Sequence, residues 1–176
     1  KINSNTVLIN GIIEDGSIKI RQNGKLRKNI IMSGSLGETT GLKLALEFAS
    51  LNQNFTLHLT GKPFRLSIKE FHQLIDEYNK VFGNIIYHGI LEYSEYVAIM
   101  NLCDIAFSLR NPTDIEHEYN FPSKILEYLS FSTIVVTTKY YKGLFPFSLV
   151  ETIPTLMIEE YIKDFRNKIK EEKTNK

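Results

Sequence analysis

The sequence predicts an α/β domain built on a doubly wound parallel sheet of the Rossmann-like kind. Two observations favour this fold class. Short apolar runs alternate with segments whose apolar residues recur at helical spacing, and three of the runs end in glycine. Strands that alternate with helices imply right-handed crossovers, which make the strands parallel. The length of 176 residues suits one well-packed domain, which we place at residues 28–170.

Each predicted strand is a short apolar run bounded by polar or turn-forming residues. We expect strands at residues 30–33, 55–60, 85–88, 104–109 and 133–138. Between them, apolar side chains three or four residues apart predict helices at residues 42–49, 71–78, 94–103 and from 123 onward. Ser94 is the expected N-cap of the third helix, with Glu95 in its first turn.

The two ends of the chain differ from this regular middle. Residues 1–27 are polar and contain turn signals such as Asn23-Gly24, so we expect an interdomain linker that could include a hairpin. Residues 158–169 predict an amphipathic helix, and residues 171–176 a frayed tail. Because the chain begins with Lys rather than Met, we expect a fragment whose upstream half is absent.

Glycines mark the carboxyl ends of the first three predicted strands, at Gly34, Gly61 and Gly89. Glycine ends many strands for purely local reasons. Three at equivalent positions favour a crevice in which the backbone approaches a ligand. Ligands of doubly wound sheets bind outside the carboxyl ends of the strands, where the strand order reverses.

The composition argues against several classes of function. The net charge is +1 and acidic residues interleave with basic ones, so we expect no nucleic-acid partner. The apolar runs are far shorter than the ~20 residues of a membrane span, and no signal peptide is recognisable. The single Cys103 excludes an internal disulfide and favours a cytoplasmic location. The four histidines are scattered, so we expect no metal site.

The first loop, residues 34–41, lacks the motifs of well-known nucleotide-binding loops. It contains neither G-x-G-x-x-G nor Gly-Lys-Ser/Thr, and no acidic residue ends the second strand. These features argue against a dinucleotide dehydrogenase and against a P-loop enzyme. Ser33 and Gly34 stand where a phospho-receiver domain would carry an acidic pair.

A polar loop at residues 111–119 carries Asp114, Glu116 and Glu118 around His117. Paired carboxylates can perform acid–base chemistry. Two interpretations stay open for this segment. It is either a solvated loop, or a loop in which Glu118 or a neighbour bonds sugar hydroxyls.

The most informative segment is Asn-Phe-Pro-Ser-Lys at residues 120–124, which opens a short helix carrying Glu127. A helix N-terminus offers unpaired N–H groups and a positive dipole end to a diphosphate. A carboxylate one turn further along can accept hydrogen bonds from ribose hydroxyls. Lys124 and Glu127, three residues apart, share a helix face. Alone they would indicate a surface ion pair of little value, but after this loop we favour ligand binding.

With these segments in order, the chain resembles the carboxyl-terminal, donor-binding domain of the group 1 (family 4) glycosyltransferases. Their GT-B fold consists of two facing Rossmann-like domains, so the resemblance implies one half of that fold. Bacterial surface-polysaccharide transferases, a subset of which carries Asn-x-Pro-Ser-Lys, are the most similar members. The resemblance covers nearly the whole chain and rests on residues 32–41, 57–61, 87–106 and 120–136 together.

The resemblance implies ligand-binding roles around the last predicted helix. Glu127 would hold the ribose hydroxyls, as the second glutamate of the family's Glu-x7-Glu motif. The first glutamate of that motif falls on Tyr119, so its sugar contact would either be lost or pass to Glu118. The diphosphate would be cradled by the backbone around Asn120, Phe121 and Ser123.

The resemblance also implies roles for two loops that precede this helix. Gly34 would let the first loop approach the phosphates. Backbone groups at Ile90 and Leu91 would meet the base.

One departure from the family concerns positive charge. The phosphate-binding Arg and Lys of the family's first loop fall on Ser35 and Thr40 in this sequence. Lys124, together with Lys62, would then supply the missing charge. Ser35 would stay a loop contact to the nucleotide-sugar.

By this resemblance the chain is the donor domain of a hexosyltransferase-type enzyme. The full enzyme would move a sugar from a UDP- or GDP-linked donor to a surface-glycan or lipid-linked acceptor, with retention and without metal or other cofactor. Acceptor-binding residues would come from the absent amino-terminal domain, so the chain alone is expected to be inactive, and no catalytic residue can be assigned. We expect it in the cytoplasm, free or peripheral at the inner membrane face. Two alternatives stay open: a non-hydrolysing sugar-nucleotide epimerase domain and a non-catalytic nucleotide-binding module.

Overall fold

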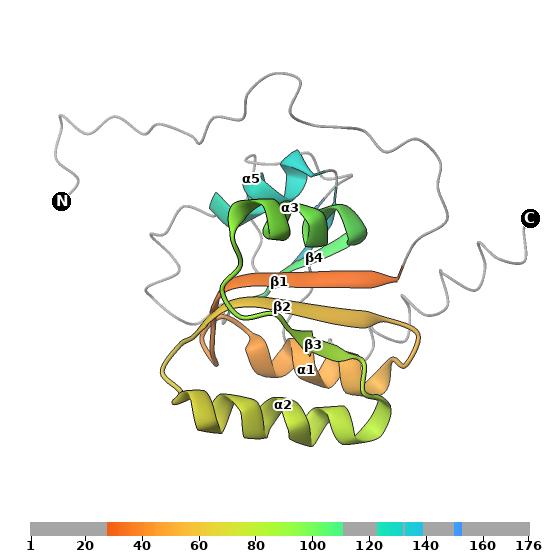
Figure 1. Ribbon diagram of the computed structural model, residues 1–176. Coiled ribbons are helices and arrows are strands. Elements are labelled where there is room, and N and C mark those ends of the chain that lie inside the picture. The colour runs from red at the N-terminus through yellow and green to blue at the C-terminus, as the bar shows by residue number, and fades with distance from the viewer. Residues whose placement is uncertain (1–27, 111–122, 132, 139–149, 153–176) are drawn as a thin grey trace, which may run out of the picture.

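The computed structural model describes residues 28–110, 123–131, 133–138 and 150–152 (Figure 1). They form a six-stranded sheet of order β3-β2-β1-β4-β5-β6, in which every neighbouring pair is parallel. The order reverses between β1 and β4, so the sheet is doubly wound. The predicted fold class is confirmed. The expected linker or hairpin at 1–27, the helix at 158–169 and the tail at 171–176 lie outside the described residues.

The predicted strands and helices match the structure within a few residues. The helices are α1 (Leu42–Leu51), α2 (Ile68–Phe82), α3 (Tyr93–Leu102) and α5 (Ser123–Ser130). The strands are β1 (Asn29–Leu36), β2 (Thr56–Pro63), β3 (Ile85–Tyr87), β4 (Ile105–Ser108), β5 (Ile134–Thr137) and β6 (Val150–Thr152). The sequence did not predict β6, because a three-residue strand is too short to show any periodicity.

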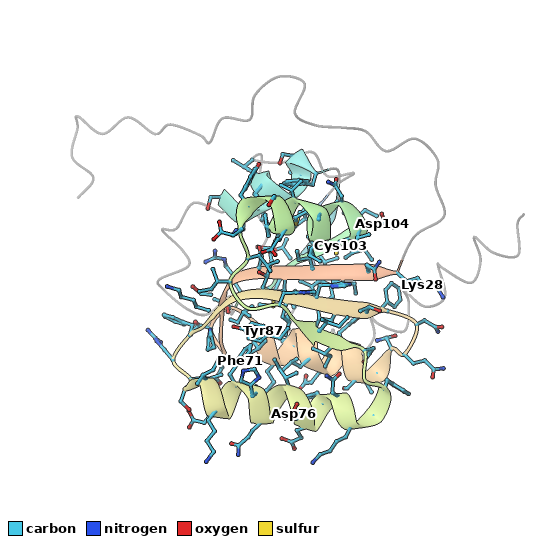
Figure 2. All side chains as sticks on the ribbon, viewed as in Figure 1. Lys28, Phe71, Asp76, Tyr87, Cys103 and Asp104 are labelled. Carbon is cyan, nitrogen blue, oxygen red and sulfur yellow. The ribbon has the colours of Figure 1, made fainter. Side chains whose placement is uncertain are left out.

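Helices cover both faces of the sheet, with α1 and α2 on one side and α3 and α5 on the other (Figure 1). On the α1/α2 side, a large apolar cluster fills the space between helices and strands. Phe71 of α2 is fully buried in it, and its ring lies edge-on to Tyr87 with centroids 4.7 Å apart (Figure 2). The strands contribute to this cluster Ile30, Met32, Leu57, Leu59, Ile105, Phe107 and Val136.

The cluster on the α3/α5 side is smaller. Its strand residues are Ile31, Ala106 and Val135, and its helix side includes Met100, Tyr128 and Leu129. Cys103, labelled in Figure 2, is fully buried here as a small core residue.

Two histidines pair on this second face. His58 is in register with Ile31, so it shares the face of that residue. Its Nδ1 lies 2.9 Å from Nε2 of His88, the two rings stack, and its Nε2 lies 3.4 Å from Oδ1 of Asn29. Burial lowers the pKa of both rings, and the neighbouring His88 lowers that of His58 further. His88 thus makes a structural hydrogen bond to His58.

The start of α3 corrects one prediction. Ser94 is not the N-cap, because it lies inside the first turn and Glu92 occupies the cap. The carboxylate of Glu95 accepts the backbone N–H of Glu92 at 3.2 Å. A glutamate at the third helical position reaches back three residues, so the helix starts after Glu92 rather than after Ser94.

The carboxyl ends of the first two strands also differ from the prediction. β1 and β2 continue two residues past Gly34 and Gly61, which face each other in register. Gly61 has φ +124°, and a Cβ there would clash with the carbonyl oxygen of Gly34. Packing between neighbouring strands therefore requires Gly61. Gly89 follows β3 as predicted.

Candidate functional site

A pocket of about 370 Å³ opens at the carboxyl ends of β1 and β4. These two strands are the neighbours at which the strand order reverses. The helix after β1, α1, and the next described helix after β4, α5, cover opposite faces of the sheet. Such a switch point is the usual ligand site of a doubly wound sheet. The pocket is lined by residues 32–35, 39–40, 64, 107–110, 124 and 128.

Gly34 forms part of the pocket wall, with φ +107°. A Cβ at this position would come within 3.5 Å of Cε of Lys124, so the lysine stem passes over a bare backbone. Gly61 and Gly89 are not among the lining residues. They are linked by a hydrogen bond of 2.7 Å from the Gly61 N–H to the Gly89 carbonyl. The crevice predicted from three glycines therefore directly involves Gly34 alone.

The loop between β1 and α1 is held by the hydroxyl of Thr40. This hydroxyl donates to the carbonyls of Ser35 at 2.7 Å and Gly37 at 3.0 Å, and it accepts the Gly37 N–H at 3.0 Å. Ser35 and Thr40 both line the pocket. Gly41, with φ +80°, lies so close to Leu109 that a Cβ would clash. The loop thus has a fixed shape against the end of β4.

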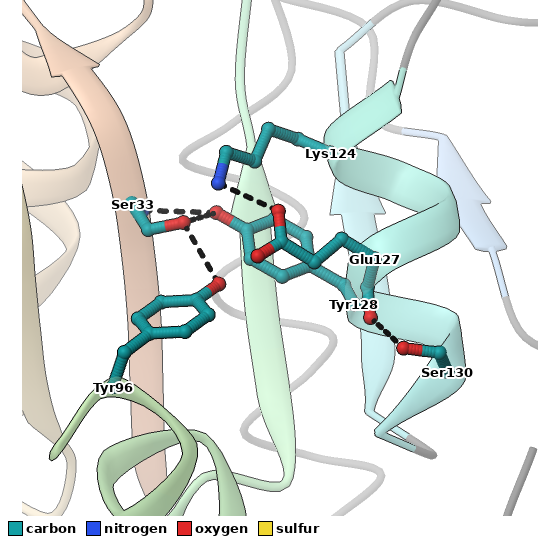
Figure 3. A network of polar contacts seen from close by, with 6 residues as sticks. All are labelled: Ser33, Tyr96, Lys124, Glu127, Tyr128 and Ser130. Carbon is teal, nitrogen blue, oxygen red and sulfur yellow. Dashed lines mark hydrogen bonds and ion pairs between the residues drawn. The ribbon is translucent and has the colours of Figure 1, made fainter. Parts of the chain in front are cut away.

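Lys124 and Glu127 form an ion pair on α5, with Nζ and Oε2 2.6 Å apart (Figure 3). Both side chains are about one-third exposed, at 37% and 33%. The Lys124 ammonium also lies 5.5 Å from the centroid of the Tyr96 ring. The two residues share a helix face, as predicted from their spacing. The ion pair keeps the lysine at the pocket wall and the carboxylate beside it.

Beneath this ion pair, two tyrosines converge on Ser33 (Figure 3). The Ser33 N–H donates to the hydroxyl of Tyr128 at 2.9 Å, and the Ser33 hydroxyl lies 3.0 Å from the same atom. The hydroxyl of Tyr96 lies 3.3 Å from that of Ser33. Burial raises the pKa of Tyr128 to about 12 and raises the pKa of Tyr96 even further. Both phenols therefore stay neutral, and they tie α3 and α5 to the end of β1.

The remaining predicted residues within the described part of the chain lie at the same sheet edge but not in the pocket wall. Lys62 is exposed and stands in register with Ser35 on the neighbouring strand. Ile90 is 68% exposed directly after Gly89, and Leu91 follows it. Ser123 begins α5. Glu118, Asn120 and Phe121, with the acidic loop at 111–119, lie outside the described residues.

Sequence reasoning missed two contributors to the pocket. Tyr128 is only 1% exposed, as a core residue would be, yet its hydroxyl reaches Ser33 and it borders the pocket. Arg110 was not considered, although it directly follows the strand predicted at residues 104–109 and lines the pocket. The same rule that singled out the glycines, a position just past the carboxyl end of a strand, would have found Arg110.

Within the part of the chain that the structure describes, no group of three His, Cys, Asp or Glu side chains could hold a metal ion. Among the same residues, no helix combines the length and apolar character that crossing a membrane requires.

Comparisons with known proteins place this architecture. A family model described as glycosyl transferases group 1 matches residues 16–172. No curated protein sequence matches the chain.

Solved structures share the fold at low sequence identity. The carboxyl-terminal domain of the glycosyl transferase group 1 protein LpcC from Francisella tularensis has a TM-score of 0.61 and 13% identity. It matches over 89% of this chain and 87% of its own. The lipopolysaccharide outer core galactosyltransferase WaaB has a TM-score of 0.62 and 13% identity, over 95% of this chain and 47% of its own. The pneumococcal O-GlcNAc transferase GtfA, solved with UDP and GlcNAc, has a TM-score of 0.55 and 11% identity, over 87% of this chain and 30% of its own. The chain thus spans under half of the longer proteins.

Proposed function

The chain belongs to the group 1 glycosyltransferases, and from this premise we propose that its pocket binds the nucleotide-sugar donor of the transfer reaction. The donor is a UDP- or GDP-linked sugar. The observation that carries this proposal is the pocket at the switch point, bordered by the bare backbone of Gly34 and by Lys124, whose ammonium pairs with the carboxylate of Glu127. A concave site with few convergent polar groups at this place in the fold is the expected form of a nucleotide site.

The proposed binding mode divides the donor among three places on the sheet edge. The diphosphate lies near Gly34 and Lys124, where the first turn of α5 adds its positive dipole end. The ribose hydroxyls bond to the carboxylate of Glu127, which the ion pair already orients. The base meets the backbone at Ile90 and Leu91, after β3.

Transfer itself depends mainly on positioning and electrostatics in this proposal. As the bond between sugar and diphosphate breaks, negative charge grows on the leaving diphosphate. Cationic groups and N–H dipoles fixed at the pocket stabilise this charge without reorganising. The proposed reaction retains the anomeric configuration and needs no metal.

The acceptor and its binding site extend the proposal beyond this chain. WaaB acts on the lipopolysaccharide outer core, and by analogy we assign a bacterial surface glycan or its lipid-linked precursor as the acceptor. The longer relatives have more than twice the aligned length, so a second, facing domain supplies the acceptor site. The enzyme would act in the cytoplasm or at the inner face of the membrane, and the 176-residue chain alone would bind donor without turnover.

Calorimetric titration of the chain with UDP, GDP, ADP, CDP and TDP tests the proposal. One diphosphate should bind saturably, and Glu127→Ala should weaken it by about 1.5–3 kcal/mol, or roughly 10- to 100-fold, as for hydrogen bonds to a charged group. Glu77→Ala, which removes an exposed carboxylate from α2, is the matched control and should bind like the original chain. Equal affinity of Glu127→Ala and the original chain would remove Glu127 from the site.

A second candidate is a non-catalytic nucleotide-binding module. It is favoured by the β1–α1 loop, which brings the hydroxyls of Ser35 and Thr40 to the pocket rather than cationic side chains. Product analysis with the enzyme joined to its acceptor domain separates the two candidates, and it also detects an epimerase. Sugar transfer supports the first candidate, whereas binding without any product supports the second.

A further inference from the structure

Two basic residues border the pocket, and they come from different elements. Lys124 belongs to the first turn of α5, and Arg110 follows the last residue of β4 by two positions. They are the Lys and Arg members of the pocket wall among the described residues. The pocket therefore presents positive charge from both the sheet and the helix layer.

Lys124 alone does not give the pocket wall a net positive charge. Its ammonium lies 2.6 Å from the carboxylate of Glu127, so this pair together has a net charge near zero. A diphosphate ester carries about two negative charges near neutral pH and accepts strong, charge-assisted hydrogen bonds. Arg110 is the second basic residue of the pocket wall, from a different element than Lys124.

The backbone of Arg110 is fixed at the pocket. Its N–H donates to Oγ1 of Thr138 at 2.7 Å, and the hydroxyl of Thr138 donates to its carbonyl. Thr138 is itself 5% exposed, at the end of β5. One buried side chain thus holds both polar backbone groups of Arg110. The arginine starts from a rigid position, which lowers the entropy lost when its side chain binds a ligand.

We infer that Arg110 binds the diphosphate of the donor, together with Lys124. This inference rests on the proposed function and adds a residue and a charge to it. A guanidinium offers a planar fork of N–H donors that matches two phosphate oxygens, whereas a lysine acts as a point charge. Arg110 holds the orientation of the diphosphate, and Lys124 adds charge beside Glu127.

Binding measurements on the 176-residue chain test this inference with Arg110→Gln. The probes are UDP and GDP, the nucleosides uridine and guanosine, and inorganic pyrophosphate, followed by calorimetry and by phosphorus NMR. Arg110→Gln should weaken diphosphate and pyrophosphate binding by about 10- to 100-fold, the usual range for a lost hydrogen bond to a charged group. Nucleoside binding should stay within about twofold, because no proposed base contact involves Arg110. Arg110→Lys should recover part of the loss.

A matched control removes one positive charge far from the pocket. Lys80→Gln changes an exposed residue in the last turn of α2 and should leave all affinities unchanged. If Arg110→Gln binds UDP or GDP like the original chain, or weakens nucleosides equally, the inference is wrong.

The two proposals fail in different ways. Binding of pyrophosphate that depends on Arg110, without any nucleoside binding, supports the diphosphate site and contradicts the nucleotide-sugar function. Nucleotide binding that is insensitive to Arg110 does the reverse. No binding of any probe to the original chain overturns both.

Discussion

On the sheet face covered by α1 and α2, the inward side chains of the central strands, such as Ile30, Met32 and Phe107, are apolar. On the face covered by α3 and α5, the strands β1, β4 and β5 begin apolar and end in hydroxyls, whereas β2 carries His58 and Thr60 there. Ile31 is followed by Ser33 in β1, Ala106 by Ser108 in β4, and Val135 by Thr137 in β5. The hydroxyl half of the second face lies at the carboxyl ends of the strands, beside the pocket.

This difference separates two physical tasks. Apolar contacts are non-directional, so the first face contributes stability but does not fix any single group. Buried hydroxyls must find hydrogen-bond partners, and these partners impose directions. Tyr128 on Ser33, and Thr137 on the Ser108 carbonyl at 3.1 Å, are contacts of this kind. The second face therefore buries less apolar surface than the first, and its hydrogen bonds position the groups around the pocket.

The largest effect should come from the apolar face. Phe71→Ala removes a fully buried ring from the α1/α2 cluster and should lower the free energy of unfolding by about 3–5 kcal/mol. Urea denaturation followed by circular dichroism measures this change. Val81→Ala, on the same helix but 60% exposed, should stay within about 0.5 kcal/mol of the original chain. A small loss for Phe71→Ala would mean that the apolar cluster is not the main source of stability.

A smaller effect should come from the hydroxyl end of the other face. Tyr128→Phe keeps the buried ring but leaves the Ser33 N–H without its acceptor, which should cost about 1–3 kcal/mol in the free energy of unfolding. Because Tyr128 also ties α5 to β1, nucleoside diphosphate affinity of the folded variant should fall as well.

Tyr93→Phe is the control for this substitution, since Tyr93 is 76% exposed and should tolerate the loss of its hydroxyl. If Tyr128→Phe lowers stability but leaves ligand affinity unchanged, the second face is a structural layer like the first. Reduced affinity in a variant that unfolds at the same urea concentration as the original chain would instead assign Tyr128 to positioning alone.

The two faces also differ in how far the sequence predicts them. The apolar face follows directly from periodicity. Within α1 and within α2 the apolar residues recur at helical spacing, and those of the inward faces, such as Leu42, Ala45 and Phe71, are buried. The hydroxyl face was not predicted, since Ser33 and Ser108 look like ordinary strand ends in a single sequence.

The candidate site was predicted in part for the same reason. Gly34, Ser35 and Lys124 line the pocket. Their positions could be predicted because local patterns in the sequence locate the ends of strands and the starts of helices. The contact of Tyr128 with Ser33 joins residues 95 positions apart, and no local pattern encodes such a pairing. Arg110 needed only the strand boundary, but its role depends on where α5 packs.

The smallest predicted effect is the pH dependence of stability, and it arises from the His58–His88 pair. Their hydrogen bond needs one ring nitrogen to accept, so two protonated rings, which only donate, cannot form it. The pKa of each ring is lowered in the folded state, by burial in both and by His88 also in the case of His58. The unfolded chain therefore binds more protons than the folded one as the pH falls past the ordinary histidine pKa of about 6.5.

The stabilisation by this pair is accordingly present above about pH 6.5 and is lost as the pH falls below it. The free energy of unfolding can change by at most about 1.4 kcal/mol per pH unit for each ring, and the partial solvation of both rings should make this change smaller. Urea denaturation at several pH values between neutral and mildly acidic conditions measures it. His88→Gln should flatten the dependence, whereas His72→Gln, which removes an exposed histidine from α2, should not. An equal slope in His88→Gln and in the original chain would show that the His58–His88 pair is not the source of the pH dependence.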